Sequence, residues 1–258
     1  MRHAKGKKRK EPFARFLPTL KGLGSLARFF MIELINGDSN TEIYEVAKKV
    51  GDRPCVIVTD PPFNIGYHYD NYIDKMGDSD YYEMLKQIFH VFPAFVVIHY
   101  PEAIYRIAFQ TGMFPDRVVS WVYNSNTPRQ HRDIAYFNVE PSFEGLGEYK
   151  NPTDKRIAAR IAEGKKAKGY DWIYCDQIKN VSDEKTGHPC QMPLEVMMYI
   201  LRTVPEDRLI CDPFMGSGTT LLAAKILGRD AIGIELSKEY FNIAKQRIAN
   251  DMPLFANS

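Results

Sequence analysis

Residues 55–63, CVIVTDPPF, place a carboxylate, two prolines and an aromatic ring directly after an apolar run. The run has the pattern of a strand buried on both faces. Pro61 and Pro62 remove two backbone donors, so the carbonyls of Asp60 and Pro61 are left to face a ligand. With the Asp60 carboxylate and the Phe63 ring, they are suited to holding a planar, amino-bearing base by hydrogen bonding and stacking. A simple strand-ending turn explains Asp-Pro-Pro alone equally well.

A second stretch far downstream changes that balance. Residues 208–220, RLICDPFMGSGTT, read as a short strand ending at Asp212, followed by a Gly216-x-Gly218 loop and a helix start. This arrangement lets backbone approach a ligand closely at a strand end. No Lys follows the second glycine, so the loop is not a phosphate-binding P-loop. The next strand, AIGIE, ends at Glu235, where a carboxylate is placed to accept hydrogen bonds from ribose hydroxyls.

The motifs DPPF, DPFMGSGTT and GIEL, in this order, resemble those of AdoMet-dependent amino methyltransferases that act on DNA bases, in the β arrangement. The resemblance implies methyl transfer from AdoMet to the exocyclic amine of a base flipped out of double-stranded DNA, at a specific short sequence. No metal is implied. The implied catalytic residues are Asp60, Pro61, Pro62 and Phe63. The implied cofactor-binding residues are Asp38, Asp212, Phe214, Gly216, Gly218, Thr219 and Glu235.

Some of these assignments have alternatives. Asp38 belongs to a Gly-Asp pair that lies near the cofactor's adenine in the family, and an ordinary turn Asp explains it as well. In HPCQMP, residues 188–193, Met192 stands where Lys is usual in a similar family element. Asp before the prolines favours adenine N6 as the target, and cytosine N4 stays open because the same acceptors serve either amine. RNA or protein-glutamine methylation, and a catalytically silent DNA-binding protein, are remoter alternatives.

Alternating strand and helix patterns predict an α/β fold, a doubly wound and mostly parallel sheet. The resemblance adds that it is of the class I AdoMet methyltransferase type, with a circularly permuted motif order. Strands are expected at 32–35, 55–59, 95–99, 118–123, 208–212 and 231–235, with helices at 41–50, 81–91, 104–110, 194–204 and 238–249. The polar segment 64–80 is expected to be a loop over the catalytic strand end. Residues 31–258 form the predicted methyltransferase domain.

Two basic segments interrupt an otherwise acidic chain. Residues 1–30 hold nine Lys or Arg and one acid, out of 34 basic and 32 acidic residues, and predict a disordered extension or a phosphate-binding arm. Residues 150–170 carry a local excess of five positive charges, which a solvated, Lys-rich helix face also explains. Because the family places its target-recognition region between the two motifs, a short insertion at about 140–185 is expected to serve this role. The predicted DNA-binding residues are Arg129 and Arg132 in the loop after the 118–123 strand, and Lys155, Arg156, Arg160, Lys165 and Lys166.

The remaining composition bounds the setting. Four cysteines lack metal-ligand spacing, which predicts reduced thiols and a cytoplasmic protein. No apolar run approaches the ~20 residues of a membrane helix, so no membrane partner is expected. Double-stranded DNA is the expected partner. The sequence leaves open a monomer or a homodimer, and a cognate restriction endonuclease.

Overall fold

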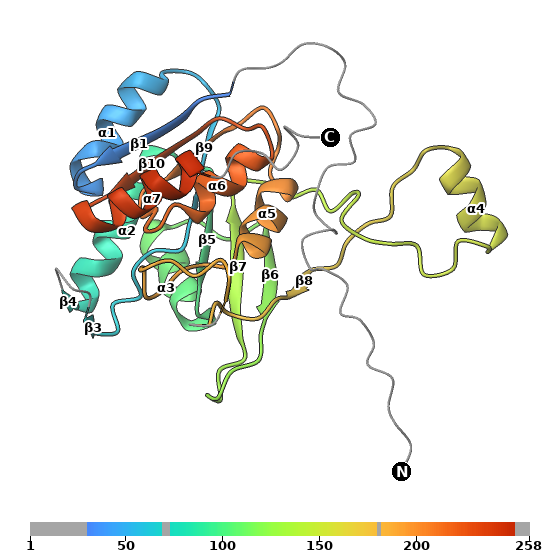
Figure 1. The fold of residues 1–258 in the computed structure, drawn as a ribbon, viewed down its shortest axis with the longest axis horizontal. Helices are drawn as coiled ribbons and strands as arrows, with labels where there is room; N and C mark the ends of the chain where they lie inside the picture. The colour runs from blue at the N-terminus through green and yellow to red at the C-terminus, as the bar shows by residue number, and fades with distance from the viewer. Residues whose placement is uncertain (1–29, 69–72, 180–181, 251–258) are drawn as a thin grey trace.

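The computed structural model describes residues 30–68, 73–179 and 182–250, so most of the predicted N-terminal extension lies outside the described residues (Figure 1). The strands are β1 (Ile32–Asn36), β2 (Cys55–Thr59), β3 (Tyr67–His68), β4 (Ile73–Asp74), β5 (Phe95–His99), β6 (Arg117–Val122), β7 (His131–Phe137), β8 (Trp172–Tyr174), β9 (Leu209–Asp212) and β10 (Ala231–Glu235). The helices are α1 (Ser39–Val50), α2 (Asp78–Val91), α3 (Pro101–Thr111), α4 (Lys155–Ala162), α5 (Leu194–Thr203), α6 (Thr219–Ile226) and α7 (Lys238–Asn250).

Eight strands form one sheet in the order β1-β10-β9-β2-β5-β7-β6-β8, while β3 and β4 pair as a small separate hairpin. Within the described sheet, β7 is antiparallel to both neighbours and every other pairing is parallel. Strands β2, β5, β9 and β10 are buried along their whole length, which explains their uninterrupted apolar sequences. The predicted doubly wound, mostly parallel α/β sheet is confirmed.

Helices cover both faces of the sheet and enclose two apolar cores. Helices α1, α2 and α3 bury residues such as Ile43, Leu85 and Ile104 against one face. Helices α5, α6 and α7 bury residues such as Ile200, Leu221 and Ala244 against the other. Because the parallel strands all end at the same edge, the residues after β2, β9 and β10 meet there, as expected for a site at the carboxyl ends of parallel strands.

Two segments differ from the sequence prediction. Residues 124–132 were expected to form a loop, but β7 begins at His131. Its first three residues, His-Arg-Asp, are polar and hide the strand pattern, whereas its last four are fully buried. Residues 64–80 were expected to be a loop throughout, and they contain the β3–β4 hairpin and the start of α2, with residues 69–72 outside the described part.

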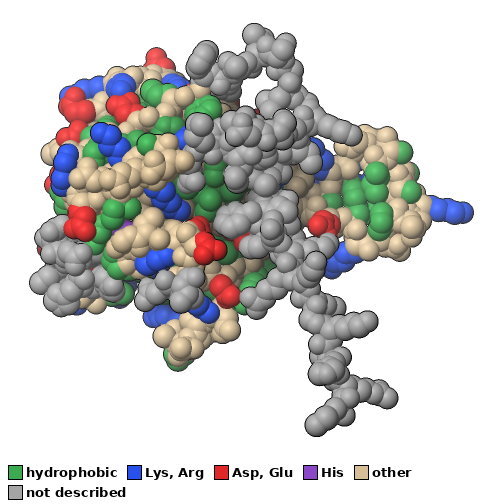
Figure 2. All heavy atoms as spheres, in the orientation of Figure 1, with side chains coloured by type: hydrophobic (Ala, Val, Ile, Leu, Met, Phe, Trp, Pro, Cys, Tyr) green, Lys and Arg blue, Asp and Glu red, His purple; other side chains and the backbone are tan. Residues whose placement is uncertain are grey.

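Helix α4 stands apart from the rest of the chain (Figure 1). None of its residues is buried, and Asp154 caps it by accepting hydrogen bonds from the backbone of Arg156 and Ile157. Figure 2 shows Lys and Arg side chains at the outer end of this projecting lobe, next to an apolar patch. Local capping and sequence propensity, rather than a packed core, therefore account for this helix.

Candidate active site

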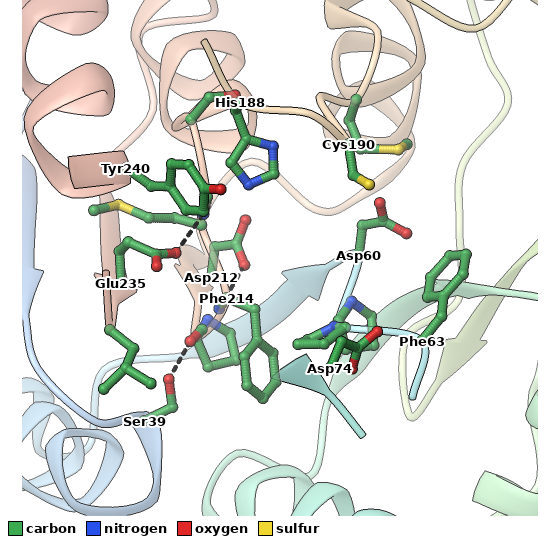
Figure 3. Close-up of a pocket in the computed structure, with 18 of the residues that line it drawn as sticks. Ser39, Asp60, Phe63, Asp74, His188, Cys190, Asp212, Phe214, Glu235 and Tyr240 are labelled. Atoms are coloured by element: carbon green, nitrogen blue, oxygen red, sulfur yellow. Dashed lines mark hydrogen bonds between the residues drawn. The ribbon is translucent and has the colours of Figure 1, made fainter. Parts of the chain in front are cut away.

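A cavity of about 320 Å³ opens at the carboxyl edge of the sheet, and both sequence motifs line it (Figure 3). The residues 60–63 reach it from the end of β2, and the loop after β9 reaches it from the neighbouring strand. Ten of the eleven predicted catalytic and cofactor-binding residues line this cavity: Asp38, Asp60, Pro61, Pro62, Phe63, Asp212, Phe214, Gly216, Thr219 and Glu235. The structure therefore joins two stretches that are about 150 residues apart in sequence.

A buried hydrogen bond links the two motifs. The hydroxyl of Thr59, the last residue of β2, donates to Asp212 Oδ1 over 2.7 Å. The same carboxylate oxygen accepts from the backbone N–H of Phe214 at 3.1 Å, which fixes the start of the glycine loop. Burial raises the pKa of Asp212 to about 6, against the opposing effect of its hydrogen bonds. Asp212 thus orients the loop as well as lining the cavity.

Glu235 holds the same loop from β10. Its two carboxylate oxygens accept from the backbone N–H groups of Gly216 at 3.0 Å and Ser237 at 2.8 Å. Gly216 has a φ of +51°, and a Cβ on it would lie 3.1 Å from His188 Nε2, so the turn requires glycine. The hydroxyl of Ser39 donates to the Pro213 carbonyl from the start of α1. Asp38 lines the cavity and also caps α1, accepting from the Asn40 N–H at 2.9 Å.

Gly218 and Thr219 were both assigned to the cofactor, and the structure separates them. Gly218 does not line the cavity: it is the N-cap of α6, and a Cβ there would meet Ala244 of α7 at 3.0 Å. A glycine at position 218 allows α6 and α7 to pack closely. The Gly-x-Gly pattern does not distinguish this role from close approach of a ligand. Thr219 lines the cavity, and its hydroxyl accepts from Arg247 Nη1 at 2.7 Å and donates to the Met192 carbonyl at 3.3 Å.

Asp60 has an unusual environment for a carboxylate. Its Oδ1 is buried and has no hydrogen-bond partner among the described residues, and its Oδ2 lies 3.8 Å from Arg132 Nη1. Burial raises the pKa of Asp60 to about 7; Arg132 opposes this shift and Asp212 adds to it. The Pro62 carbonyl accepts from Tyr81 Oη at 2.6 Å, so that backbone acceptor is already used. The unpaired Asp60 oxygen is available to a donor that enters the cavity.

The Phe63 ring already carries two stacked groups. His99, at the end of β5, stacks on it with ring centroids 4.3 Å apart, and the Arg132 guanidinium carbon lies over it at 4.6 Å. Burial lowers the pKa of His99 to about 3, with Arg132 adding to the effect, so the imidazole is neutral at neutral pH. Both of its ring nitrogens are engaged, Nε2 with Tyr81 Oη at 3.1 Å and Nδ1 with the Tyr100 N–H at 2.8 Å.

The structure corrects the location of Arg132. It was assigned to a polar, partly basic loop, but it lies on β7 with its side chain only 16% exposed, inside the cavity. The alternation of β7 turns it inward, and Trp121 on the paired strand lies 5.3 Å from its guanidinium carbon. Arg129 is exposed as predicted, but it forms an ion pair with Glu102 at 2.8 Å and covers Tyr100 at 4.2 Å.

The other predicted DNA-binding residues lie away from the cavity. Lys155, Arg156 and Arg160 are on α4, and Lys165 and Lys166 follow it, all of them exposed. Lys165 is 2.7 Å from Glu163, which leaves the lobe with a net positive charge. No residue of this segment lines the cavity between the two motifs.

The comparison with known proteins agrees with these motifs. A family model described as DNA methylase, with the designation N6_N4_Mtase, matches residues 55–246, which include both motifs and the segment between them. The chain belongs to this DNA methylase family.

Other members of the DNA methylase family are similar over most of the chain. The type II methyltransferase M.HpaI of Haemophilus parainfluenzae is 26% identical over 215 residues, which cover 76% of this chain and 68% of that protein. The crystal structure of the M1.HpyAVI–SAM complex is 24% identical with a TM-score of 0.60, and covers 84% of this chain and 99% of that one. The PvuII DNA methyltransferase, described as cytosine-N4-specific, is 17% identical with a TM-score of 0.58, and covers 84% and 86%. Both structures share the class I fold of this DNA methylase.

Sequence reasoning missed several residues that line the site of this DNA methylase. Asp74, on β4, is buried and accepts from the Asn64 N–H at 3.0 Å, so it shapes the turn after Phe63. An Asp in a polar segment gives no signal of this role. Ser39 and Tyr240 were likewise missed, because a serine at a helix start and a tyrosine within an amphipathic helix give no signal of a ligand; Arg132 was assigned to DNA and not to this cavity. The ring of His188 packs edge-on against Tyr240 at 4.4 Å.

Three global features complete the description of this DNA methylase. All four cysteines are free thiols. In the described ranges, no three His, Cys, Asp or Glu side chains come together as a metal site. Within the same ranges, no helix combines the length and apolarity that crossing a membrane requires.

Proposed function

We propose that this DNA methylase transfers a methyl group from AdoMet to adenine N6, in a base flipped out of double-stranded DNA at a specific short sequence. The observation that carries the proposal is one cavity in which the Asp60 carboxylate, whose Oδ1 has no hydrogen-bond partner among the described residues, and the Phe63 ring lie across from Asp212, Phe214 and Glu235. Such a cavity suits two ligands that must meet, because the two motifs line separate parts of one space.

The residues of the loop fit AdoMet. Gly216 presents bare backbone to the cavity, and Glu235 uses one lone pair of each carboxylate oxygen, which leaves acceptor capacity for ribose hydroxyls. Phe214 and Asp38 supply an aromatic face and a second carboxylate on the same side. The Thr219 hydroxyl would donate to the cofactor carboxylate after giving up its 3.3 Å hydrogen bond to the Met192 carbonyl. AdoMet supplies a methyl group on a positively charged sulfonium, which makes the methyl electrophilic.

The catalytic motif would prepare the amine. The exocyclic nitrogen of adenine is a poor nucleophile because its lone pair is delocalised into the ring. Asp60 and the Pro61 carbonyl would each accept a hydrogen bond from one of its two N–H groups. These hydrogen bonds would localise the lone pair and direct it at the methyl group of AdoMet. The Asp60 carboxylate would also stabilise positive charge as it develops on the nitrogen. Phe63 would stack on the flipped base.

Cytosine N4 methylation is the second candidate. The same two acceptors would serve its amine, and an enzyme described as cytosine-N4-specific has the same fold. Asp rather than Ser before the prolines favours adenine.

The lobe between the two motifs would read the DNA. We assign target recognition to about residues 140–185, because the exposed Lys155, Arg156, Arg160, Lys165 and Lys166 give this lobe a basic surface outside the cavity. Arg129, on the rim, would contact a phosphate after exchanging its Glu102 partner. A monomeric or homodimeric state, a cognate restriction endonuclease and a cytoplasmic location stay predictions.

The test is to incubate the protein with tritiated AdoMet and a mixture of unmodified duplexes, and then to identify the modified base after digestion to nucleosides. N6-methyladenine is the expected product, and N4-methylcytosine would select the second candidate. Asp60→Ala should abolish transfer while AdoMet still binds, because Asp60 lies on a different strand from the glycine loop. Loss of AdoMet binding by this variant, measured by calorimetry, would contradict the division of roles.

A further inference from the structure

The guanidinium of Arg132 lies in the part of the cavity that a flipped base would need. It is over the Phe63 ring at 4.6 Å and faces the Asp60 carboxylate at 3.8 Å. These are the same two partners that the proposed function gives to the target base. A base that stacks on Phe63 must therefore displace one of the two groups already stacked there, His99 or Arg132.

Arg132 is the less firmly held of the two. Its guanidinium lies 3.8 Å from the Asp60 carboxylate, which is beyond a normal hydrogen-bond distance, and it contacts Met192 Sδ at 3.8 Å and the Tyr123 side chain. Its Nε is buried without a partner in the described part of the chain. His99, in contrast, has hydrogen bonds on both ring nitrogens and lies at the end of a buried strand.

We infer that Arg132 occupies the target-base position in the DNA-free enzyme and leaves it when the base enters. The inference rests on the proposed function. A guanidinium is planar and carries N–H groups, the two properties that an acceptor beside an aromatic face selects. The target amine gains positive charge as it reacts, and a second cation at the same carboxylate would oppose that charge. Arg132 is thus a positioning residue: it keeps the buried Asp60 charge paired until the base replaces it.

The ionisation of Asp60 provides a readout of where Arg132 lies. The groups that act on the Asp60 carboxylate come from other elements: Arg132 of β7, Asp212 of β9 and Tyr81 of α2. Other titratable groups line the same cavity: Asp74, Lys75, His188, Cys190, Glu235 and Tyr240. Arg132 is the group that lowers the pKa of Asp60, so replacing it should raise that pKa. Protonated Asp60 accepts poorly, so activity should fall on the acid side.

The pH dependence of kcat/KM reports the free enzyme, and that of kcat reports the complex with substrate. If Arg132 has left Asp60 in the complex, Arg132→Gln should move the acid limb of kcat/KM to higher pH and leave the acid limb of kcat in place. The assay is methyl transfer into a long unmodified duplex amplified in vitro, from about pH 5.5 to about pH 9. Arg129→Gln is the matched control for the position of the limb: it removes the same charge three residues away without touching Phe63, and loss of its proposed phosphate contact should lower kcat/KM at every pH without moving the limb.

Binding of neutral nucleosides gives a second readout without phosphates or catalysis. Adenosine or cytidine, titrated by calorimetry, should bind Arg132→Gln about two- to thirtyfold more tightly than the wild type. That range corresponds to a lost cation–π contact of about 0.5–2 kcal/mol. Arg129→Gln should match the wild type. If Arg132 instead binds a DNA phosphate, Arg132→Gln should leave the nucleoside affinity unchanged and lower the salt dependence of DNA binding.

Several outcomes would overturn the inference. If Arg132→Gln moves the acid limbs of both kcat/KM and kcat, Arg132 stays beside Asp60 during the reaction. If it moves neither limb, Arg132 has only a structural role. Equal nucleoside affinity in the two proteins, or binding by neither, would also count against it. Arg132→Lys, which keeps the charge, should restore the kcat/KM limb and so controls for misfolding. If the wild type transfers no methyl group to DNA, the proposed function fails, and the nucleoside titration still decides whether Arg132 blocks the site.

Discussion

Asp60→Asn should stabilise the folded protein while removing its activity. In the folded protein the pKa of Asp60 is raised from 3.8 to about 7 by burial. Between these two pH values the folded state binds more protons than the unfolded chain, so the free energy of unfolding falls as pH rises, and the full penalty is present above pH 7. At about 1.4 kcal/mol per pKa unit, the ionised carboxylate costs about 4 kcal/mol at about pH 8.5, and about 2 kcal/mol at about pH 5.5.

Asn is neutral and so resembles protonated Asp60. Both leave Arg132 without a counter-charge, so Asp60→Asn should raise the free energy of unfolding by most of the cost of ionising Asp60. The measurement is urea unfolding of both proteins at the two pH values, with linear extrapolation to water. Asp52→Asn, in the exposed turn before β2, is the control and should lie within about 0.5 kcal/mol of the wild type at both pH values. A variant that is no more stable at about pH 8.5, or whose gain is the same at both pH values, would refute the reasoning.

Three further predictions concern the cofactor loop and the basic segments. Glu235→Ala removes the acceptor of the Gly216 and Ser237 N–H groups and of the proposed ribose hydroxyls, so AdoMet affinity measured by calorimetry should fall by about 1.5–3 kcal/mol; unchanged affinity would show that Glu235 only ends a strand. Gly216→Ala adds a Cβ at a positive φ and 3.1 Å from His188, and it should weaken AdoMet binding, whereas Gly164→Ala, at a similar φ with open space around it, should not. Replacing Arg156 and Arg160 together should lower activity and change discrimination between cognate and scrambled duplexes, while a chain starting at Met31 should bind all duplexes less tightly with a flatter salt dependence. Salt titrations of binding test this pair, and the assignment is wrong if the shortened chain loses discrimination and the double variant keeps it.

The parts of the fold that the sequence predicted share a simple physical origin. A strand buried on both faces must be apolar throughout, so β2, β5, β9 and β10 were visible as uninterrupted runs. Because parallel strands end at one edge, the two predicted strand ends lie near each other, and the Thr59–Asp212 hydrogen bond joins them. The Gly-x-Gly pattern also predicted the turn at Gly216. The same pattern assigned Gly218 to the ligand, whereas in the structure Gly218 packs against α7.

Arg132 shows why the remainder was not predictable. Its sequence surroundings, PRQHRD, are those of a basic loop, and nothing local distinguishes a side chain that points to solvent from one that points into the sheet edge. The direction is set by the register of β7 between β5 and β6, which depends on antiparallel pairing with residues 9 to 42 positions away in the chain. A register shift of one residue would turn Arg132 to the other face of the sheet, and Asp60 would lose its ion-pair partner. The charge balance of this candidate site therefore depends on a strand that lies outside both sequence motifs.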